Sequence, residues 1–334
     1  TQLSVYKKYK RNIDISWNRF QKKNIHKMLK WRKKHLPNQY KKTIFYPFSG
    51  PDILHGLTFY PQGTDFLMFG LEKIGHIPDP LSMDRKRRLR DLRGLPVALN
   101  FILNHNFFIT RYMLKRIGRT SYSGITGVMM FFLARNGYTI KDVKKFVLND
   151  GRLYYKTKLV SPQKNKDLSR TPETVNGVEI IFYKNKKQLR RLRFVKINIE
   201  NKSKQIDNFL DFLQTYPSMS TMIKSASYLM HLKSFSKIRN AILKKSVSVL
   251  EDDSGIPYRK FDKNVWKISY FGKYHVPIRV FKGFTQKDLS RAIDKHSPGL
   301  LPFSYGYGFK FIDMTYHLIY AQKKSYVKSL SAKK

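Results

Sequence analysis

A serine, an aspartate and a histidine lie close together in FYPFSGPDILH, residues 45–55, and hydrolases combine these side chains in catalytic triads. Ser49 follows a predicted strand and precedes a predicted helix, which is the position of a nucleophile elbow. The surrounding Phe-Ser-Gly-Pro lacks the Gly-x-Ser-x-Gly pattern that permits the strained turn of such an elbow. We therefore favour a structural role, in which Ser49 or Asp52 caps the helix and Pro51 lies in its first turn.

The same segment shares some features with a nucleotide-binding loop. Gly50 lies between the predicted strand and helix, and Glu72 ends the next predicted strand at about the 20-residue spacing of a ribose-binding acid. A dinucleotide fingerprint has three glycines, however, whereas this loop has one. Pro51 also removes a backbone amide that would bind phosphate. We therefore predict no cofactor.

A second polar segment is KSASYLMH, residues 224–231. On a helix, Ser227 and His231 would lie one turn apart and face the same side. Such a pair usually forms internal hydrogen bonds, so a buried, hydrogen-bonded histidine is favoured over a catalytic base.

A third polar segment, EDDSGIP at residues 251–257, places Asp252 and Asp253 beside another carboxylate. Adjacent carboxylates can bind a cation or form a general acid–base pair. Asp-Asp-Ser-Gly is also common in turns, and this very basic chain offers many Lys and Arg partners. The turn is the favoured interpretation.

Several kinds of site are excluded by composition or spacing. The chain has no cysteine, which excludes disulfides, thiolate zinc sites and a cysteine nucleophile. Its nine histidines are scattered, without the H-x-x-x-H or H-E-x-x-H spacing of helical metal sites. We predict no metal site.

Charge is the most unusual property of the sequence. The 66 Lys and Arg residues outnumber 22 Asp and Glu residues and give a net charge of +44. Like charges in this number repel one another unless an anionic partner or counterions neutralise them. Aromatic residues interleave the basic clusters, as in proteins that bind phosphates and stack on bases, although no nucleic-acid-binding signature occurs. An anionic envelope surface rich in lipopolysaccharide would fit as well. The residues predicted to bind are Lys7, Lys8, Lys10, Arg11, Trp31, Arg32, Lys33, Lys34, Arg85, Lys86, Arg87 and Arg88.

The patterns predict a mixed α/β fold in three parts. These are a basic helical arm over 1–42, a single body over 43–322 with a candidate subdivision near residue 140, and a basic tail over 323–334. The compact body begins with a short β-α-β unit (43–48, 52–59, 65–72), continues with helices (83–117, 125–135) and adds antiparallel hairpins around Asn149-Asp-Gly and Asn185-Lys-Lys. A helix is predicted over 16–35, with Asp14 or Ser16 as its N-cap. Residues 204–246 are predicted to form helix in two or three pieces broken at Pro217, and residues 247–322 are predicted to be rich in strands.

Three motifs together resemble a family of uncharacterised bacterial proteins that usually carry an export signal or a lipoprotein-like start. They are TIFYPFSGPD with FGLE, then KSASYLMH, then DDSGIP, and the resemblance spans about residues 40–310. It implies a location in the periplasm or at the periphery of the outer membrane rather than an activity. It also motivates the hypothesis that folding joins the motifs in one pocket, lined by Ser49, Asp52, His231, Asp252 and Asp253.

We therefore expect a noncatalytic envelope-associated protein that binds an anionic partner or serves as a subunit of a larger assembly. A hydrolase that uses Asp52, His231 and Asp253 is the second hypothesis. A nucleic-acid-associated protein, which would be cytoplasmic, is the third. No transmembrane segment is predicted, because no run approaches the ~18–20 apolar residues that a membrane helix needs.

Overall fold

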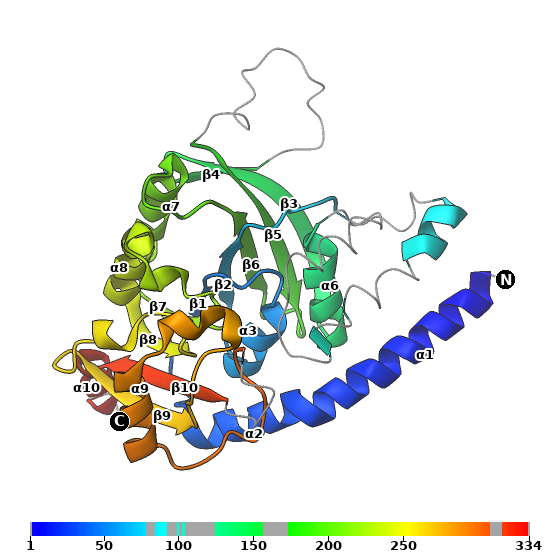
Figure 1. The fold of residues 1–334 in the computed structure, drawn as a ribbon. Coiled ribbons are helices and arrows are strands. Elements are labelled where there is room, and N and C mark those ends of the chain that lie inside the picture. Colours follow the sequence, from blue (N-terminus) through cyan, green and yellow to red (C-terminus); the bar gives the residue numbers. More distant parts are fainter. Residues whose placement is uncertain are drawn as a thin grey trace.

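The computed structural model describes residues 2–77, 84–91, 99, 102–103, 124–155, 173–307 and 316–332. Within these residues the mixed α/β prediction is confirmed: one ten-stranded sheet lies between two layers of helices (Figure 1). The helix predicted over 83–117 lies largely outside the described residues. None of the helices in the described part of the chain has the length and hydrophobicity needed to cross a bilayer.

The sheet has the strand order β4-β3-β5-β6-β2-β1-β7-β8-β10-β9. Its strands are β1 (Thr43–Tyr46), β2 (Asp65–Gly70), β3 (Thr139–Asn149), β4 (Arg152–Tyr155), β5 (Val175–Tyr183), β6 (Arg190–Lys196), β7 (Met219–Ile223), β8 (Ser246–Glu251), β9 (Trp266–Gly272) and β10 (His317–Lys323). The five central strands, β6 to β8 in spatial order, are mutually parallel. Antiparallel strands extend the sheet on both sides.

The centre of the sheet forms where the sequence is apolar on both faces. TIFY, DFLMFG and MSTMI of β1, β2 and β7 are almost fully buried, as expected for parallel strands covered on both sides. The predicted β-α-β unit is confirmed, with α3 (Ile53–Phe59) joining β1 to β2. The chain later returns to place β7 on the other side of β1. The direction of winding therefore reverses between β1 and β7, which makes this the topological switch point of the sheet.

Helices cover the two faces. On one face lie α1 (Gln2–Phe20), the π-helix η1 (Gln21–Ile25), α2 (His26–His35), α3 and α6 (Thr126–Arg135). On the other lie α7 (Lys204–Gln214), α8 (Ser236–Lys245) and α9 (Lys287–His296). The basic tail begins with α10 (Lys324–Ser331), directly after β10.

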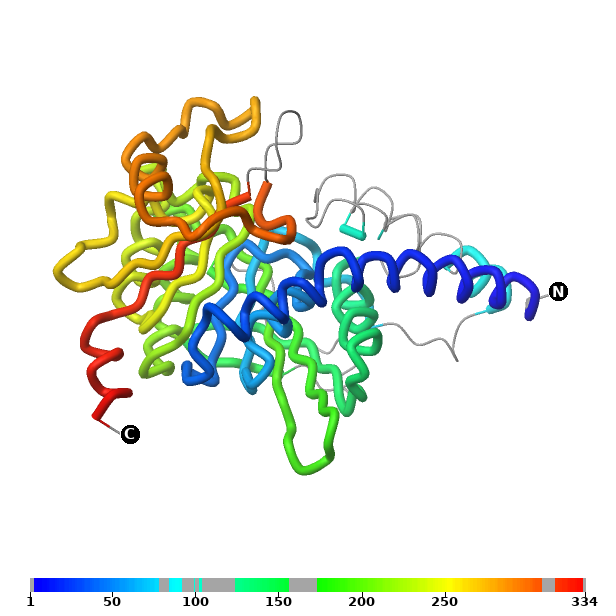
Figure 2. The backbone as a smooth tube through the Cα atoms, turned by 90° about the horizontal axis from the view of Figure 1, so that it is seen from below, coloured from blue at the N-terminus to red at the C-terminus, as the bar shows by residue number. Residues whose placement is uncertain are grey.

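The N-terminal helix is longer than predicted. It runs through α1, η1 and α2 from Gln2 to His35, so the predicted start near residue 16 is wrong. Asp14 does not cap it but pairs within it, at 2.7 Å from Lys10 and 2.5 Å from Arg135 of α6. The apolar side of the helix packs on the body, whereas its first turns extend beyond the sheet (Figures 1 and 2).

Both predicted hairpins are confirmed by the antiparallel pairs β3–β4 and β5–β6. In the first, Asp150 and Gly151 have φ of 47° and 68°, the left-handed values that a tight hairpin turn requires.

The helical prediction over 204–246 is partly wrong. The chain forms α7 and α8 there, but MSTMI after Pro217 forms the buried strand β7 between them, where pairing with β1 and β8 outweighs local helical preference. The following segment contains only two short 3-10 helices, η3 (Leu229–His231) and η4 (Lys233–Phe235). Ser227 and His231 therefore do not share the face of an α-helix.

Candidate functional site

A pocket of about 630 Å³ lies at the carboxyl ends of the parallel strands. The loops after β1, β2, β6 and β7 form most of its wall, and Tyr307 and the segment around the 3-10 helix η6 (Arg279–Phe284) complete it. Open α/β sheets bind ligands at this edge, beside the switch point. The wall is mainly apolar and includes Phe48, Phe69, Ile199, Leu229, Phe235 and Phe281.

A buried ion pair contributes to this apolar wall. Lys224 Nζ donates to Asp52 Oδ2 over 3.0 Å, and the two side chains are only 1% and 4% exposed. The Tyr46 hydroxyl donates to the same oxygen over 3.0 Å, and His55 Nδ1 lies 2.6 and 2.7 Å from the two Asp52 oxygens. Burial alone would raise the pKa of Asp52, but the charges and hydrogen bonds of His55 and Lys224 outweigh it and lower the pKa to about 2. Asp52 is therefore ionised at neutral pH.

Asp52 also caps α3, as one of the two predicted capping residues. Its side chain accepts from the His55 backbone amide over 3.3 Å, whereas the Ser49 hydroxyl donates to the carbonyl of Gly50. Pro51 precedes the cap rather than lying in the first helical turn. His55 is fully buried and its ring packs edge-on against Phe20 of α1, away from the pocket wall. Asp52 and Lys224, rather than His55, therefore line the pocket.

The acidic segment after β8 forms a second buried network. Asp252 accepts from the Ser254 amide (3.2 Å), the Ser254 hydroxyl (2.5 Å) and the Ser225 amide (3.1 Å). Burial and the neighbouring Asp253 carboxylate raise the pKa of Asp252 to about 6. Burial also raises the pKa of Glu251 well above its usual range. The network stabilises the loop after β8 and holds the backbone at Ser225.

His231 meets Asp253 through the backbone. Its Nε2 lies 3.1 Å from the Asp253 carbonyl oxygen, while the Asp253 carboxylate accepts from the Tyr228 hydroxyl over 2.7 Å and lies 3.2 Å from His317 Nε2. Burial lowers the pKa of His231, so its ring is neutral at pH 7 and can donate Nε2–H to that carbonyl. This contact is structural, since it uses a carbonyl rather than the carboxylate.

The five residues predicted to share one pocket are divided between separate places. Ser49 and Asp52 line the switch-point pocket. His231 lines another pocket, of about 560 Å³, bounded by charged surface residues of the 259–291 region. Asp252 and Asp253 belong to the wall of neither pocket. The predicted Asp52, His231 and Asp253 constellation is therefore not assembled around one ligand space.

Left-handed backbone conformations concentrate at the switch-point pocket. Phe48, Ser225 and Ser227 line it with φ of 57°, 54° and 56°, and Tyr228 follows with 57°. Non-glycine residues rarely adopt such angles, and strained residues of this kind cluster at functional sites. The loop after β7 is therefore held in a costly conformation where it meets the pocket.

Sequence reasoning missed the role of Lys224. The residue begins the KSASYLMH motif, but its partner Asp52 lies 172 positions earlier in the chain, so no local spacing connects them. One sequence feature could have indicated that Lys224 lies at a site. It directly follows the apolar run MSTMI, and ligands of parallel sheets bind at the carboxyl ends of such buried strands.

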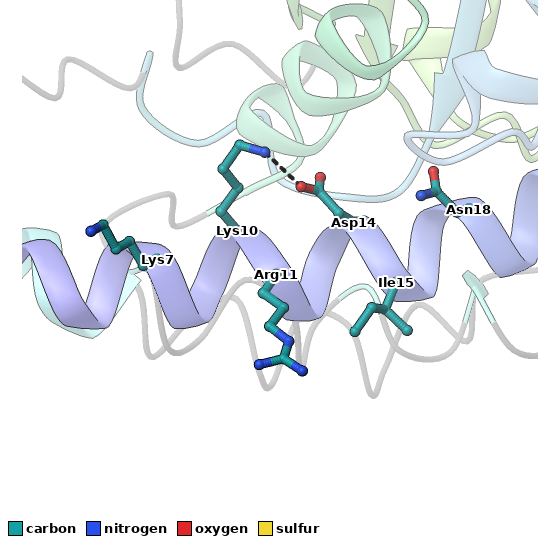
Figure 3. Close-up of a pocket in the computed structure, with 6 residues that line it drawn as sticks. All are labelled: Lys7, Lys10, Arg11, Asp14, Ile15 and Asn18. Atoms are coloured by element: carbon teal, nitrogen blue, oxygen red, sulfur yellow. Dashed lines mark hydrogen bonds and ion pairs between the residues drawn. The ribbon is translucent and has the colours of Figure 1, made fainter.

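The predicted basic binding residues lie elsewhere, and two of them face inward. Trp31 is buried against Phe271, and buried Arg32 donates to the carbonyl of Phe59 over 3.1 Å. The lysines and arginines of the first turns of α1 are exposed. Figure 3 shows a shallow hollow on α1, where Lys10 turns toward Asp14 and Arg11 points to the other side of the helix. Also exposed are Lys33, Lys34, Arg85, Lys86 and Arg87, with Arg88 partly covered.

Comparisons of the chain with protein-family models, curated proteins and solved structures found no match. Among the described residues, no group of three or more His, Asp or Glu side chains is arranged to hold a metal ion. Function is therefore argued from the geometry of the pocket and of the basic helix.

Proposed function

We propose that the protein binds a small amphipathic molecule in the switch-point pocket. The Lys224–Asp52 ion pair carries this proposal, because it is nearly excluded from solvent and yet lines an apolar pocket. Removing two charges from water costs several kcal/mol per ion, and apolar residues of similar size often stabilise a fold as well or better. A charged pair in this position is explained by a ligand whose polar group it orients.

The size and lining of the pocket support a ligand rather than a structural cavity. Pockets for small molecules usually have volumes of about 300–1,000 Å³ and mainly apolar walls with a few placed polar groups. This pocket, of about 630 Å³, has that composition. At its rim Val280 is 82% exposed, an apolar side chain available to an apolar ligand.

Titration with the neutral fluorescent probe N-phenyl-1-naphthylamine tests the proposal. We expect saturable binding of one probe per chain. The double variant Leu71→Trp/Val280→Trp places two large rings at exposed positions of the pocket wall and should weaken binding at least tenfold. The control is Leu189→Trp/Val265→Trp, which adds the same rings at exposed positions outside this pocket. Equal binding by both double variants, or no saturable binding by the wild type, would contradict the proposal.

A second function is supported by the projecting end of α1. Lys7, Lys8, Lys10 and Arg11 are exposed on turns that extend beyond the sheet (Figures 1 and 3). We propose that this end docks on an anionic partner, in line with the envelope location that the motif resemblance implies. An anionic lipid or lipopolysaccharide surface is the partner that we favour, and nucleic acid or another protein subunit is the alternative. Binding to phosphatidylglycerol vesicles should weaken steeply with salt, and salt-independent binding would contradict it.

A further inference from the structure

Ser225 carries a buried hydroxyl that the fold leaves without a partner. Its Oγ is shielded from solvent and has no hydrogen-bond partner among the described residues, and Ser225 lines the switch-point pocket. Buried polar groups in native proteins are nearly always hydrogen-bonded. A hydroxyl without a partner on a pocket wall is therefore explained by a ligand that forms a hydrogen bond with it.

The backbone of Ser225 is held firmly in an unfavourable conformation. Its φ of 54° directly follows β7, and the amide donates to Asp252 Oδ2 over 3.1 Å. Its carbonyl accepts from the Tyr307 hydroxyl over 2.9 Å. The next residue, Ala226, donates its amide to Ser254 Oγ over 2.7 Å. A strained backbone conformation persists when several surrounding contacts hold it in place. Here those hydrogen bonds fix the position of the Ser225 hydroxyl, which itself has no hydrogen-bond partner among the described residues.

The surroundings of Ser225 favour binding over covalent chemistry. A serine nucleophile needs a base hydrogen-bonded to its hydroxyl, and Oγ has no such neighbour among the described residues. The nearby Asp252 carboxylate accepts instead from the Ser225 amide and from Ser254. The hydroxyl is thus placed to donate to or accept from a bound molecule.

The charges beside Ser225 restrict the polar group of that molecule. The wall contains one ammonium, Lys224, and two carboxylates, Asp52 and Glu72. A carboxylate on the ligand would be repelled, because the wall holds more negative than positive charge. A protonated amine would be attracted by the carboxylates, but it cannot accept a hydrogen bond and would leave the Ser225 hydroxyl proton without an acceptor. An uncharged carbonyl group escapes the repulsion and accepts hydrogen bonds from both a hydroxyl and an ammonium.

We infer that Ser225, beside Lys224, binds the uncharged carbonyl head, an amide or ester, of an amphipathic ligand whose apolar part lies against Phe48, Leu229 and Phe281. This inference rests on the proposed small-molecule function and names the class of its ligand.

Displacement of N-phenyl-1-naphthylamine by decanamide, decanoate and decylamine tests the inference, because these probes share an apolar chain and differ in the charge of the head. Decanamide should displace the dye at the lowest concentration. Ser225→Ala should weaken decanamide about 3- to 10-fold, the effect of losing one hydrogen bond, and leave binding of the dye unchanged. Ser225→Gly should give the same loss while tolerating the left-handed backbone.

Ser227→Ala is the matched control, since Ser227 lines the same pocket but its hydroxyl already lies 2.8 Å from that of Tyr307. It should leave the affinity for decanamide unchanged. The inference is overturned if decanoate or decylamine displaces the dye more strongly than decanamide does. It is also overturned if Ser225→Ala and Ser225→Gly bind decanamide as tightly as the wild type. In both cases, saturable binding of the dye still supports the proposed function. Absence of dye binding to the wild type overturns both.

Discussion

The switch-point edge of the sheet and the projecting end of α1 use charge in opposite ways. Of only 22 acidic residues in the chain, five lie buried at this edge: Glu251 ends β8, and the loops hold Asp52, Glu72, Asp252 and Asp253. The first turns of α1 instead expose Lys7, Lys8, Lys10 and Arg11, with Asp14 as a nearby acid. The net charge of +44 therefore describes the surface and says little about the pocket.

The difference separates two kinds of electrostatic effect. Buried charges at the pocket act as individual pairs with fixed geometry, because burial makes each unpaired charge costly. Exposed charges on α1 act as a sum, because water and salt screen each one. Substitutions should therefore affect the free energy of unfolding strongly at the pocket and weakly on the helix.

The largest effect is expected for Lys224→Met. The substitution leaves the Asp52 carboxylate buried without its ammonium partner and should lower the free energy of unfolding by about 3–5 kcal/mol. Lys7→Met, on exposed α1, should change it by less than about 0.5 kcal/mol. Urea unfolding measures both. The double variant Lys224→Met/Asp52→Asn should recover part of the lost free energy of unfolding. Equal effects of Lys224→Met and Lys7→Met would contradict the proposed difference between the pocket and α1.

The next effect is a pH dependence of opposite sign at two aspartates. Because the pKa of Asp252 rises from 3.8 to about 6 on folding, about 3 kcal/mol of stability present below pH 4 is lost as the pH rises through 6. Because the pKa of Asp52 falls from 3.8 to about 2, about 2 kcal/mol present above pH 4 is lost as the pH falls to 2.

Unfolding of Asp252→Asn and Asp52→Asn between pH 2 and 7 measures these two contributions. Asp252→Asn should flatten the dependence only between about pH 4 and 6, and Asp52→Asn only below about pH 4. The same change of slope in both variants would show that the two carboxylates do not occupy different electrostatic environments.

A smaller effect distinguishes two serines that both lie beside Asp252. Ser254 Oγ accepts from Ala226 and donates to Asp252, so Ser254→Ala should cost about 1–3 kcal/mol. Ser225→Ala removes a hydroxyl that has no partner among the described residues and should change stability by less than about 0.5 kcal/mol. Thermal unfolding compares the pair. A cost at Ser225 equal to that at Ser254 would mean that its hydroxyl is satisfied within the fold.

The smallest effect on stability is expected for Lys7→Gln/Lys8→Gln/Lys10→Gln/Arg11→Gln. This variant loses the exposed Lys10–Asp14 pair, which water and salt screen, and should otherwise unfold like the wild type. Its binding to phosphatidylglycerol vesicles should weaken by about 1 kcal/mol for each charge that lies near the surface. Vesicle sedimentation at several salt concentrations measures this binding. If the variant binds as tightly as the wild type, the first turns of α1 are not the docking surface.

The sequence predicted the parts of the fold that depend on short-range patterns. Apolar runs located β1 and β2, Asn149-Asp-Gly located a hairpin, and the residue types of FYPFSGPD located the capped turn after β1. Strand β7 escaped prediction because a buried five-residue run between two helices has no period that distinguishes it from helix.

The site was harder to predict because tertiary pairing creates it. Asp52 was recognised as a polar residue in a turn, but its partnership with Lys224 arises only when β7 packs beside β1. Likewise, nothing in KSASYLMH distinguishes Ser225, whose hydroxyl lacks a partner, from Ser227, whose hydroxyl has one. Trp31 and Arg32 were predicted to bind from their place in a basic cluster, whereas helix packing turned both inward.

The most direct measurement is a titration of N-phenyl-1-naphthylamine into three proteins at low and high salt: the wild type, the pocket variant Leu71→Trp/Val280→Trp and the α1 variant with four glutamines. We predict one salt-independent site per chain in the wild type and the α1 variant, and a loss of at least tenfold in affinity in the pocket variant. Binding that survives in the pocket variant, or that falls with the charges of α1, would contradict a ligand site at the switch point.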